Sequence, residues 1–98
     1  MLFRSHAGAV AAIADTACGY AALTLFPPGV GVLTTEFKIN LLAPAKGDRL
    51  IAEGRVKRAG KTLAVCLGEV FAETGGDRKS VALMTASMMV VSHMDIVD

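Results

Sequence analysis

The chain has 98 residues, which predicts a single domain (residues 1–98) with one core. Its composition is 53% hydrophobic and 19% charged, and its formal net charge is +1. So small a charge gives no strong positive field, and one Tyr, four Phe and no Trp give no aromatic platform for single strands. We therefore exclude nucleic acid as a partner.

The first predicted element is a helix over about residues 8–25, with Ser5 as a candidate N-cap. Pro27, Pro28 and Gly29 end it. The segment is apolar on nearly all sides, which is typical of a buried helix rather than a surface one. Small residues that let a sheet approach closely fill much of it: Ala9, Ala11, Ala12, Ala14, Ala17, Gly19, Ala21 and Ala22.

The apolar run at residues 7–14 follows Arg4 as in a secretory signal peptide, but Asp15 interrupts it. A carboxylate at mid-bilayer is costly, so Asp15 also argues against a membrane span.

Cys18 and Cys66 lack metal-ligand spacing and are interpreted as small core residues, although a disulfide between them stays open. A chain with only two cysteines is not typical of a small secreted domain stabilised by disulfide bonds. We predict a cytoplasmic protein with no membrane partner, metal or cofactor.

Four strands are predicted after the helix, at residues 32–42, 49–58, 62–73 and 79–92, with hairpin turns at 59–61 and 74–77. The first alternates between a largely apolar face (Leu33, Thr35, Phe37, Ile39 and Leu41) and a polar face (Thr34, Glu36, Lys38 and Asn40). The third is apolar on both faces, so it is predicted to be central. A helix followed by a four-strand meander indicates an α+β fold in which a curled antiparallel sheet wraps the helix. The tail, residues 93–98, is predicted to fray.

Asp15 is the main candidate for chemistry because it is the only charged residue between Arg4 and Glu36. Burying an ionised carboxylate without partners costs several kcal/mol, and ionisable groups in apolar surroundings tend to sit at working sites. We interpret Asp15 as a general base or nucleophile that faces a cleft. The alternative is an exposed polar position on the helix, or a carboxylate that pairs at an interface.

The predicted start of the helix, His6-Ala7-Gly8, is a second candidate. Free backbone N–H groups at a helix N-terminus stabilise negative charge, so those of Ala7 or Gly8 are candidates to hold an oxyanion. The alternative is an ordinary helix start that binds nothing.

Two further candidates lie in the strands. Arg58, Lys61 and Thr62 cluster at a hairpin turn, where they indicate either phosphate binding or an ordinary solvated turn. Thr34, on the polar face of the first strand, is interpreted either as holding a water molecule or as a good strand former.

Taken in order, four blocks of sequence resemble the hotdog-fold acyl-coenzyme A thioesterases, and among them the phenylacetate-degradation group. The blocks are His6-Ala7-Gly8, Ala14-Asp15-Thr16-Ala17, residues 34–45 followed by Gly47-Asp48, and residues 58–64. The resemblance extends from His6 to about Val91. Members of the family usually carry several tens of residues before this histidine, whereas here five residues precede it. They also usually have two glycines after the histidine, and here Ala7 occupies the position of the first.

The resemblance implies a role for each candidate. Asp15 corresponds to the catalytic carboxylate, the Ala7 N–H to the group that polarises the thioester carbonyl, and Thr34 to the residue near the attacking water. His6 and Gly8, on either side of Ala7, are assigned to substrate binding. The residues expected to contact the coenzyme are Arg58, Lys61 and Thr62.

The implied activity is hydrolysis of an acyl-coenzyme A (acyl-CoA) thioester to free acid and coenzyme A (CoA). The alternative on the same fold is a non-catalytic module that binds acyl-CoA or CoA. The resemblance also implies that two subunits join their sheets and share each active site, and that such dimers commonly pair into tetramers.

The apolar fraction is high for so short a chain, and a lone domain of this size cannot hide all of it. We therefore expect size-exclusion chromatography with light scattering to show a homodimer or a homotetramer. A clean monomer would contradict this expectation.

Overall fold

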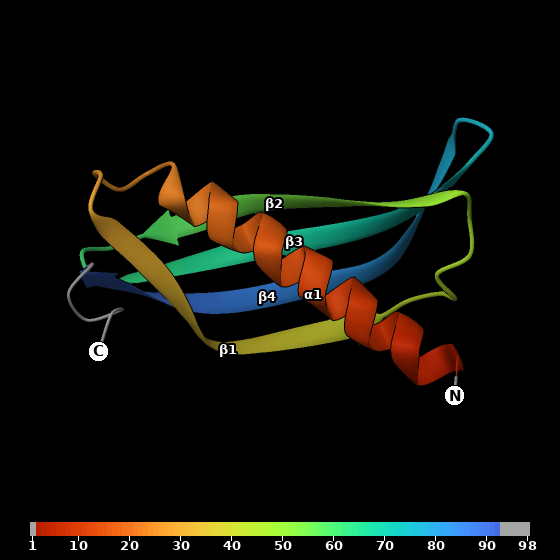
Figure 1. Cartoon of the computed structure of the whole chain (residues 1–98), viewed down its shortest axis with the longest axis horizontal. Helices are drawn as coiled ribbons and strands as arrows, with labels where there is room; N and C mark the ends of the chain where they lie inside the picture. The colour runs from red at the N-terminus through yellow and green to blue at the C-terminus, as the bar shows by residue number, and fades with distance from the viewer. Residues whose placement is uncertain (1, 93–98) are drawn as a thin grey trace.

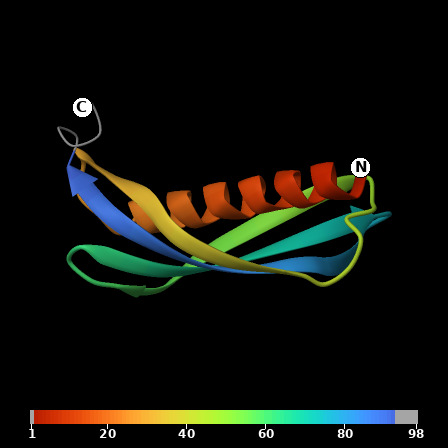
Figure 2. The ribbon, with the colours of Figure 1, turned by 90° about the horizontal axis from the view of Figure 1, so that it is seen from below.

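The computed structural model describes residues 2–92 and the side chains of residues 8–91. In that part of the chain, one helix precedes four strands: α1 (Leu2–Leu23), β1 (Val30–Leu41), β2 (Arg49–Ala59), β3 (Leu63–Thr74) and β4 (Asp77–Ser92). The strands form one curved antiparallel sheet, and α1 lies diagonally across one of its faces (Figures 1 and 2). The predicted α+β class and hotdog architecture are confirmed. The predicted fraying of residues 93–98 lies outside the described residues.

All four predicted strands are confirmed to within two residues at each end. Gly75 and Gly76 form the two-residue turn between β3 and β4, with φ values of 58° and 90°. A turn with positive φ at both central residues matches the right-handed twist of the flanking strands, and glycine adopts such angles without a Cβ clash.

The predicted meander is wrong for its first strand. The strand order is β1-β4-β3-β2, so β1 pairs with β4 at one edge and not with β2. Residues 42–48 connect β1 to β2 and run past the end of the sheet, where the Leu42 N–H donates to the Val81 carbonyl and the Asp48 N–H to the Glu73 carbonyl, both at 2.8 Å. A connection of this length does not impose a tight hairpin. The predicted central position of β3 is confirmed.

The predicted start of the helix is also wrong, because α1 begins at Leu2 and not near Gly8. Ser5 therefore lies inside the helix and is not its N-cap. No proline or glycine occurs between Leu2 and Ala7, and a single glycine inside a helix costs only about 1 kcal/mol. The helix ends at Leu23, two residues earlier than predicted, before the Pro27-Pro28-Gly29 stretch.

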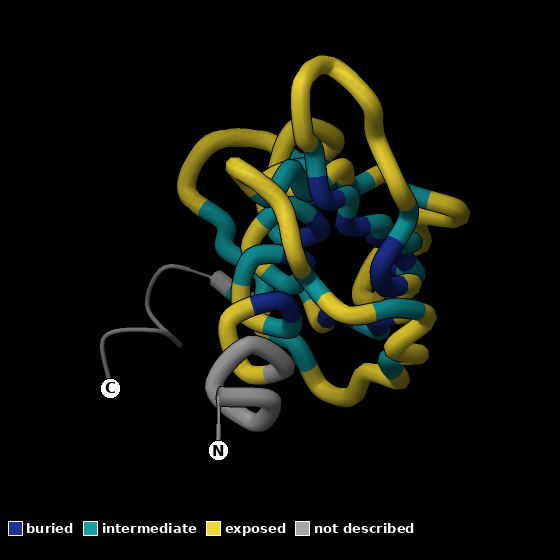
Figure 3. Tube along the Cα trace, turned by 90° about the vertical axis from the view of Figure 1, so that its right-hand side faces the viewer, coloured by how far each residue is buried: buried dark blue, intermediate teal, exposed yellow. Residues whose placement is uncertain are grey.

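One face of α1 packs on the sheet. The helix residues buried there recur every four positions: Val10, Ala14, Cys18 and Ala22. They meet alternate residues of β3 and β4 to form the core, which lies between the helix and the sheet (Figure 3). Ala12, Thr16 and Tyr20 are exposed. The expectation that the helix is buried on all sides is therefore wrong for the single chain, because the sheet curves around one side only.

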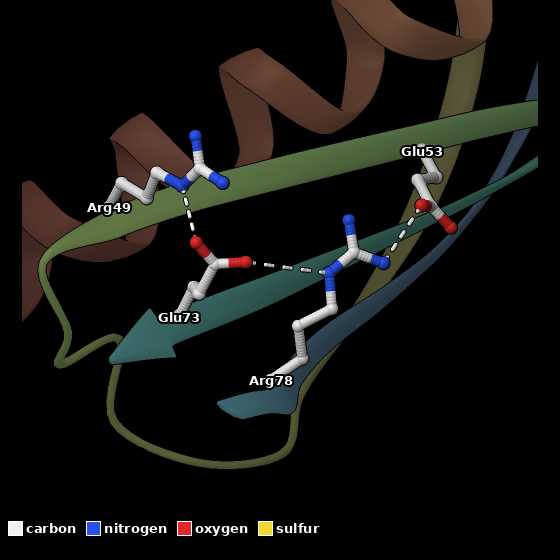
Figure 4. Close-up of polar contacts among 4 residues, drawn as sticks. All are labelled: Arg49, Glu53, Glu73 and Arg78. Atoms are coloured by element: carbon white, nitrogen blue, oxygen red, sulfur yellow. Dashed lines mark hydrogen bonds and ion pairs between the residues drawn. The ribbon is translucent and has the colours of Figure 1, made fainter. Parts of the chain in front are cut away.

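The opposite face of the sheet carries a cross-strand ion-pair network (Figure 4). Arg49 on β2 donates from Nε to Glu73 on β3 at 2.6 Å, and Arg78 on β4 lies 3.1 Å from Glu53 and 3.9 Å from Glu73. The hydrogen bond from Arg49 lowers the pKa of Glu73. These contacts join β2, β3 and β4 on the side of the sheet away from α1.

Both cysteines are buried, free thiols, which confirms their interpretation as core residues. Burial, with contributions from Cys66 and Asp15, raises the pKa of Cys18 to about 11, and burial also raises the pKa of Cys66. At pH 8 only about 0.1% of Cys18 would then be thiolate.

We therefore expect iodoacetamide at pH 8 to label neither cysteine in the folded protein and both in urea, as measured by mass spectrometry. Rapid labelling of either thiol under native conditions would contradict the packing of α1 on β3.

Candidate active site

The candidate site is built around a hydrogen bond between the helix and the edge strand. Asp15 lies in the middle of α1 and is half-buried, and Thr34 lies in β1. The Thr34 hydroxyl donates to Oδ1 of Asp15 at 2.7 Å. This distance is typical of a hydrogen bond from a hydroxyl to an oxygen. The structure thus brings together two of the predicted site residues.

A β-bulge in β1 turns Thr34 toward the helix. The register places Thr34 opposite Met88 and Glu36 opposite Ser87, so Thr35 is the extra residue. Met88 is buried on the helix side, and Thr34 therefore lies on that side too. The predicted polar face of β1, with Thr34 beside Glu36, is wrong because strict alternation assumes no bulge.

After the bulge the alternation resumes in the opposite phase. Phe37, Ile39 and Leu41 are paired with Ala86, Met84 and Ala82, which are all buried on the helix side. Leu33, before the bulge, lies on the outer face with Glu36, Lys38 and Asn40. Thr34 thus shares the side of the strand that faces Asp15 with Phe37, Ile39 and Leu41.

Asp15 is the group best suited to acid–base chemistry in this region. Cys18, one helical turn further along, is a thiol whose raised pKa keeps it neutral near pH 7 and hence a poor nucleophile. A carboxylate that is half-exposed remains reachable by water and substrate, whereas a fully buried one would not.

The three residues predicted to open the helix lie inside it instead. Ala7 and Gly8 are more than four residues from Leu2, whereas only the first four N–H groups of a helix lack a partner within it. The side chains of His6 and Ala7 lie outside the described residues. The oxyanion role of the Ala7 N–H stays a prediction, and it requires a helix that begins near Ala7.

Arg58, Lys61 and Thr62 are exposed at the turn between β2 and β3. This turn lies at the end of the molecule near the C-terminus of α1, whereas the N-terminus of α1 lies at the other end (Figures 1 and 2). One chain therefore does not bring the hairpin residues together with residues 6–8.

Among the described side chains, those of residues 8–91, no group of three or more His, Cys, Asp and Glu is arranged to hold a metal ion. The described helix is also not long and apolar enough to cross a membrane.

Comparison with known proteins identifies the family. The family model described as the thioesterase superfamily matches residues 5–79, which include most of α1 and all of β1, β2 and β3. The chain belongs to the thioesterase superfamily. The matched region contains both Asp15 and Thr34.

Solved structures of similar proteins share the fold. A thioesterase family protein from Silicibacter pomeroyi is 41% identical, with a TM-score of 0.86 over 89% of this chain and 64% of that chain. The BH2602 protein from Bacillus halodurans, solved with CoA, is 30% identical, with a TM-score of 0.80 over 86% of this chain and 57% of that one. A phenylacetic acid degradation-related protein from Ralstonia eutropha is 26% identical, with a TM-score of 0.74 over 84% and 59% of the two chains.

A curated protein from Halobacterium salinarum that carries the provisional name of an esterase is 40% identical over 62 residues. This match covers 61% of the present chain and 40% of that protein. The chain thus spans less than two thirds of the length of each of these four relatives. The predicted resemblance to hotdog thioesterases, including the phenylacetate-degradation group, is confirmed.

The contact between Asp15 and Thr34 is testable by a double-mutant cycle on unfolding in urea. We expect the free energies of unfolding of Asp15→Ala and Thr34→Val to show a coupling of about 1 kcal/mol. Either substitution alone removes the hydrogen bond, so the double variant does not lose it a second time.

Thr35→Val is the matched control, since the Thr35 hydroxyl donates to the Ser87 carbonyl and not to Asp15. With Asp15→Ala it should be additive. Additivity in both cycles would show that Thr34 does not bond to Asp15 in solution.

Proposed function

We propose that this protein hydrolyses an acyl-CoA thioester to a free acid and CoA, with Asp15 as the catalytic carboxylate. The observation that carries the proposal is the hydrogen bond from Thr34 to Asp15, in a chain that belongs to the thioesterase superfamily. The solved relative from Bacillus halodurans was crystallised with CoA, which supports a CoA thioester as the substrate class.

In the proposed reaction Thr34 holds Oδ1 of Asp15, and Oδ2 takes a proton from a water molecule. The oxygen of that water attacks the thioester carbonyl carbon and forms a tetrahedral oxyanion. The oxyanion collapses, the carbon–sulfur bond breaks, and the CoA thiolate takes the proton from Asp15. Direct attack by the carboxylate, followed by hydrolysis of the resulting anhydride, uses the same residue and gives the same products.

The oxyanion donor proposed from the resemblance, the Ala7 N–H, implies a second copy of the chain. Ala7 and Asp15 are eight residues apart in one helix, which is about 12 Å along its axis. One carbonyl cannot contact both groups at that separation. We therefore infer that Asp15 works with the Ala7 N–H of a second copy, in a site shared between two subunits, with His6 and Gly8 beside the substrate. This role requires that the helix begins near Ala7 in the assembled protein and not at Leu2.

Exposed apolar side chains support this assembly. Tyr20 on α1 is 68% exposed, and Phe37 and Leu41 on the helix side of β1 are each 51% exposed. β1 is also an edge strand, whose free backbone groups are able to pair with a second sheet. We propose a homodimer, or a tetramer of two such dimers, and the molar mass in solution tests this.

The exposed cations at the hairpin turn suit the phosphates of CoA. Arg58 and Lys61 both point into solvent at one end of the sheet, with Thr62 beside them. In a shared site a second copy brings this end of the molecule toward an active site that is distant within one chain.

The free thiols of Cys18 and Cys66 fit the reducing conditions of the cytoplasm, where we place the protein.

The deciding experiment is thiol release from short, long and aromatic acyl-CoA thioesters by the wild type and by Asp15→Asn. We expect the wild type to turn over and the variant to lose about 100- to 10,000-fold in kcat, because the amide cannot accept the proton. Thr35→Val is the control that should keep the wild-type rate.

The alternative is a module that binds acyl-CoA or CoA without turnover. It would be supported if the wild type and Asp15→Asn both bind CoA, stay folded and release no thiol. An active Asp15→Asn variant would remove the carboxylate from the mechanism.

A further inference from the structure

Two glycines face each other under the helix. Gly54 on β2 and Gly68 on β3 are directly paired in the sheet. Both lie on the helix side, because an added Cβ atom at either position would meet α1. They form a patch of bare backbone, the glycine seat, on which the middle of the helix rests.

The contact at Gly54 is between backbones. A Cβ atom added there would lie 2.5 Å from the carbonyl carbon and oxygen of Ala17 and 2.6 Å from the nitrogen of Cys18. No side-chain rotation relieves such a clash, so the helix itself would have to move. At Gly68 an added Cβ would lie 3.0 Å from Sγ of Cys18 and 3.4 Å from the Ala14 carbonyl oxygen.

Along the row of paired residues that contains the glycine seat, side chains are large on β1 and β4 and absent on β3 and β2. From β1 to β2, the paired residues of this row on the helix side are Ile39, Met84, Gly68 and Gly54. The neighbouring rows end in Cys66 and Val56 on one side, and in Val70 and Ala52 on the other. Of these three rows, only the one with Gly54 and Gly68 lacks a side chain on β2 and also on β3. The helix therefore contacts the sheet backbone over β2 and β3, and reaches β1 through Asp15.

The turn that rests on the seat is the turn that carries the carboxylate. Ala14, Ala17 and Cys18 meet the two glycines, and Asp15 lies between them in sequence. Its carboxylate extends the other way and accepts the hydrogen bond from Thr34 at 2.7 Å. The seat on one side and Thr34 on the other thus fix the position of Asp15.

We propose that Gly54 and Gly68 are positioning residues for catalysis, because the helix turn seated on them sets where Asp15 meets Thr34 and the substrate. This inference rests on the proposed function, in which Asp15 is the catalytic carboxylate. It adds two residues on the far side of the helix that touch neither substrate nor Asp15.

The test compares Gly54→Ala with Gly19→Ala in thiol release from the best acyl-CoA thioester. Gly19 is on the same helix, and an added Cβ there would meet no atom within 4 Å. We expect Gly54→Ala to lower kcat by about 10- to 100-fold with little change in KM, because a displacement of about 1 Å is enough to misalign a catalytic group. Gly19→Ala should keep the wild-type kcat.

Gly68→Ala provides a test by rescue. Its methyl group meets the sulfur of Cys18, so Cys18→Ala should restore kcat in the Gly68→Ala background. The same Cys18→Ala change should not restore Gly54→Ala, whose clash is with backbone. If Gly54→Ala fails to fold, the loss and rescue at Gly68 decide the question alone.

The proposal is overturned if Gly54→Ala or Gly68→Ala folds and keeps the wild-type kcat while Asp15→Asn is inactive. That result leaves the proposed function intact. If the wild type has no activity, the cycle between Asp15→Ala and Thr34→Val is repeated in the Gly68→Ala background. Loss of the coupling, and its return with Cys18→Ala, supports the seat without any turnover, and an unchanged coupling rejects it.

Discussion

A half-buried carboxylate in an otherwise uncharged stretch of helix is the constraint that organises this molecule. Asp15 needs a hydrogen-bond donor on the side that faces protein, and Thr34 supplies it from the edge strand. A donor from a central strand would have drawn the carboxylate into the core, where water cannot reach it. Because β1 lies at the edge, one oxygen is held by protein while the carboxylate as a whole stays partly exposed. A carboxylate base requires this combination of fixed position and access to water.

The two sides of the helix meet the sheet in different ways. On the β2 and β3 side, contact is made through backbone and small residues, so its geometry has little freedom. On the β1 side, two polar side chains form a hydrogen bond beside the apolar packing of Val32 and Ile39 against the core. The small residues that make the helix look apolar throughout are thus used unequally. Ala14, Ala17 and Cys18 meet the sheet closely, while Ala9 and Ala12 remain exposed.

Local patterns in the sequence were enough to predict the strands and their turns. Period-two alternation and paired glycines such as Gly75 and Gly76 are local features, and they placed all four strands to within two residues. The partner of β1 was not predictable in this way, because it depends on a connection, residues 42–48, that favours no single pairing. The helix start was missed because residues 2–7 contain neither a breaker nor a strong stop signal.

The candidate site was predicted by residue type but not by geometry. Asp15 stands out in the sequence as a lone charge, whereas Thr34 was placed on the wrong face of β1. The bulge that corrects its direction falls at Thr35 in a Thr-Thr pair, and no glycine or proline marks it. The glycine seat was equally hidden. Gly54 and Gly68 look like isolated glycines within strands, and only the pairing of β2 with β3 brings them together under the helix.

Two exposed apolar residues of β1, Phe37 and Leu41, lie on the same side of the sheet as the candidate site, and this has a consequence for the proposed assembly. Phe37 and Leu41 follow Thr34 along the helix side of β1, so a second copy that covers them also closes over Asp15. The surface that drives association would then be the surface that binds the acyl chain. A side chain on that surface would both pack against the second copy and contact the acyl chain. A substitution that reshapes the acyl pocket would therefore also alter the dimer interface. The glycine seat lies on β2 and β3, away from that surface, and so is able to fix the carboxylate without taking part in either contact.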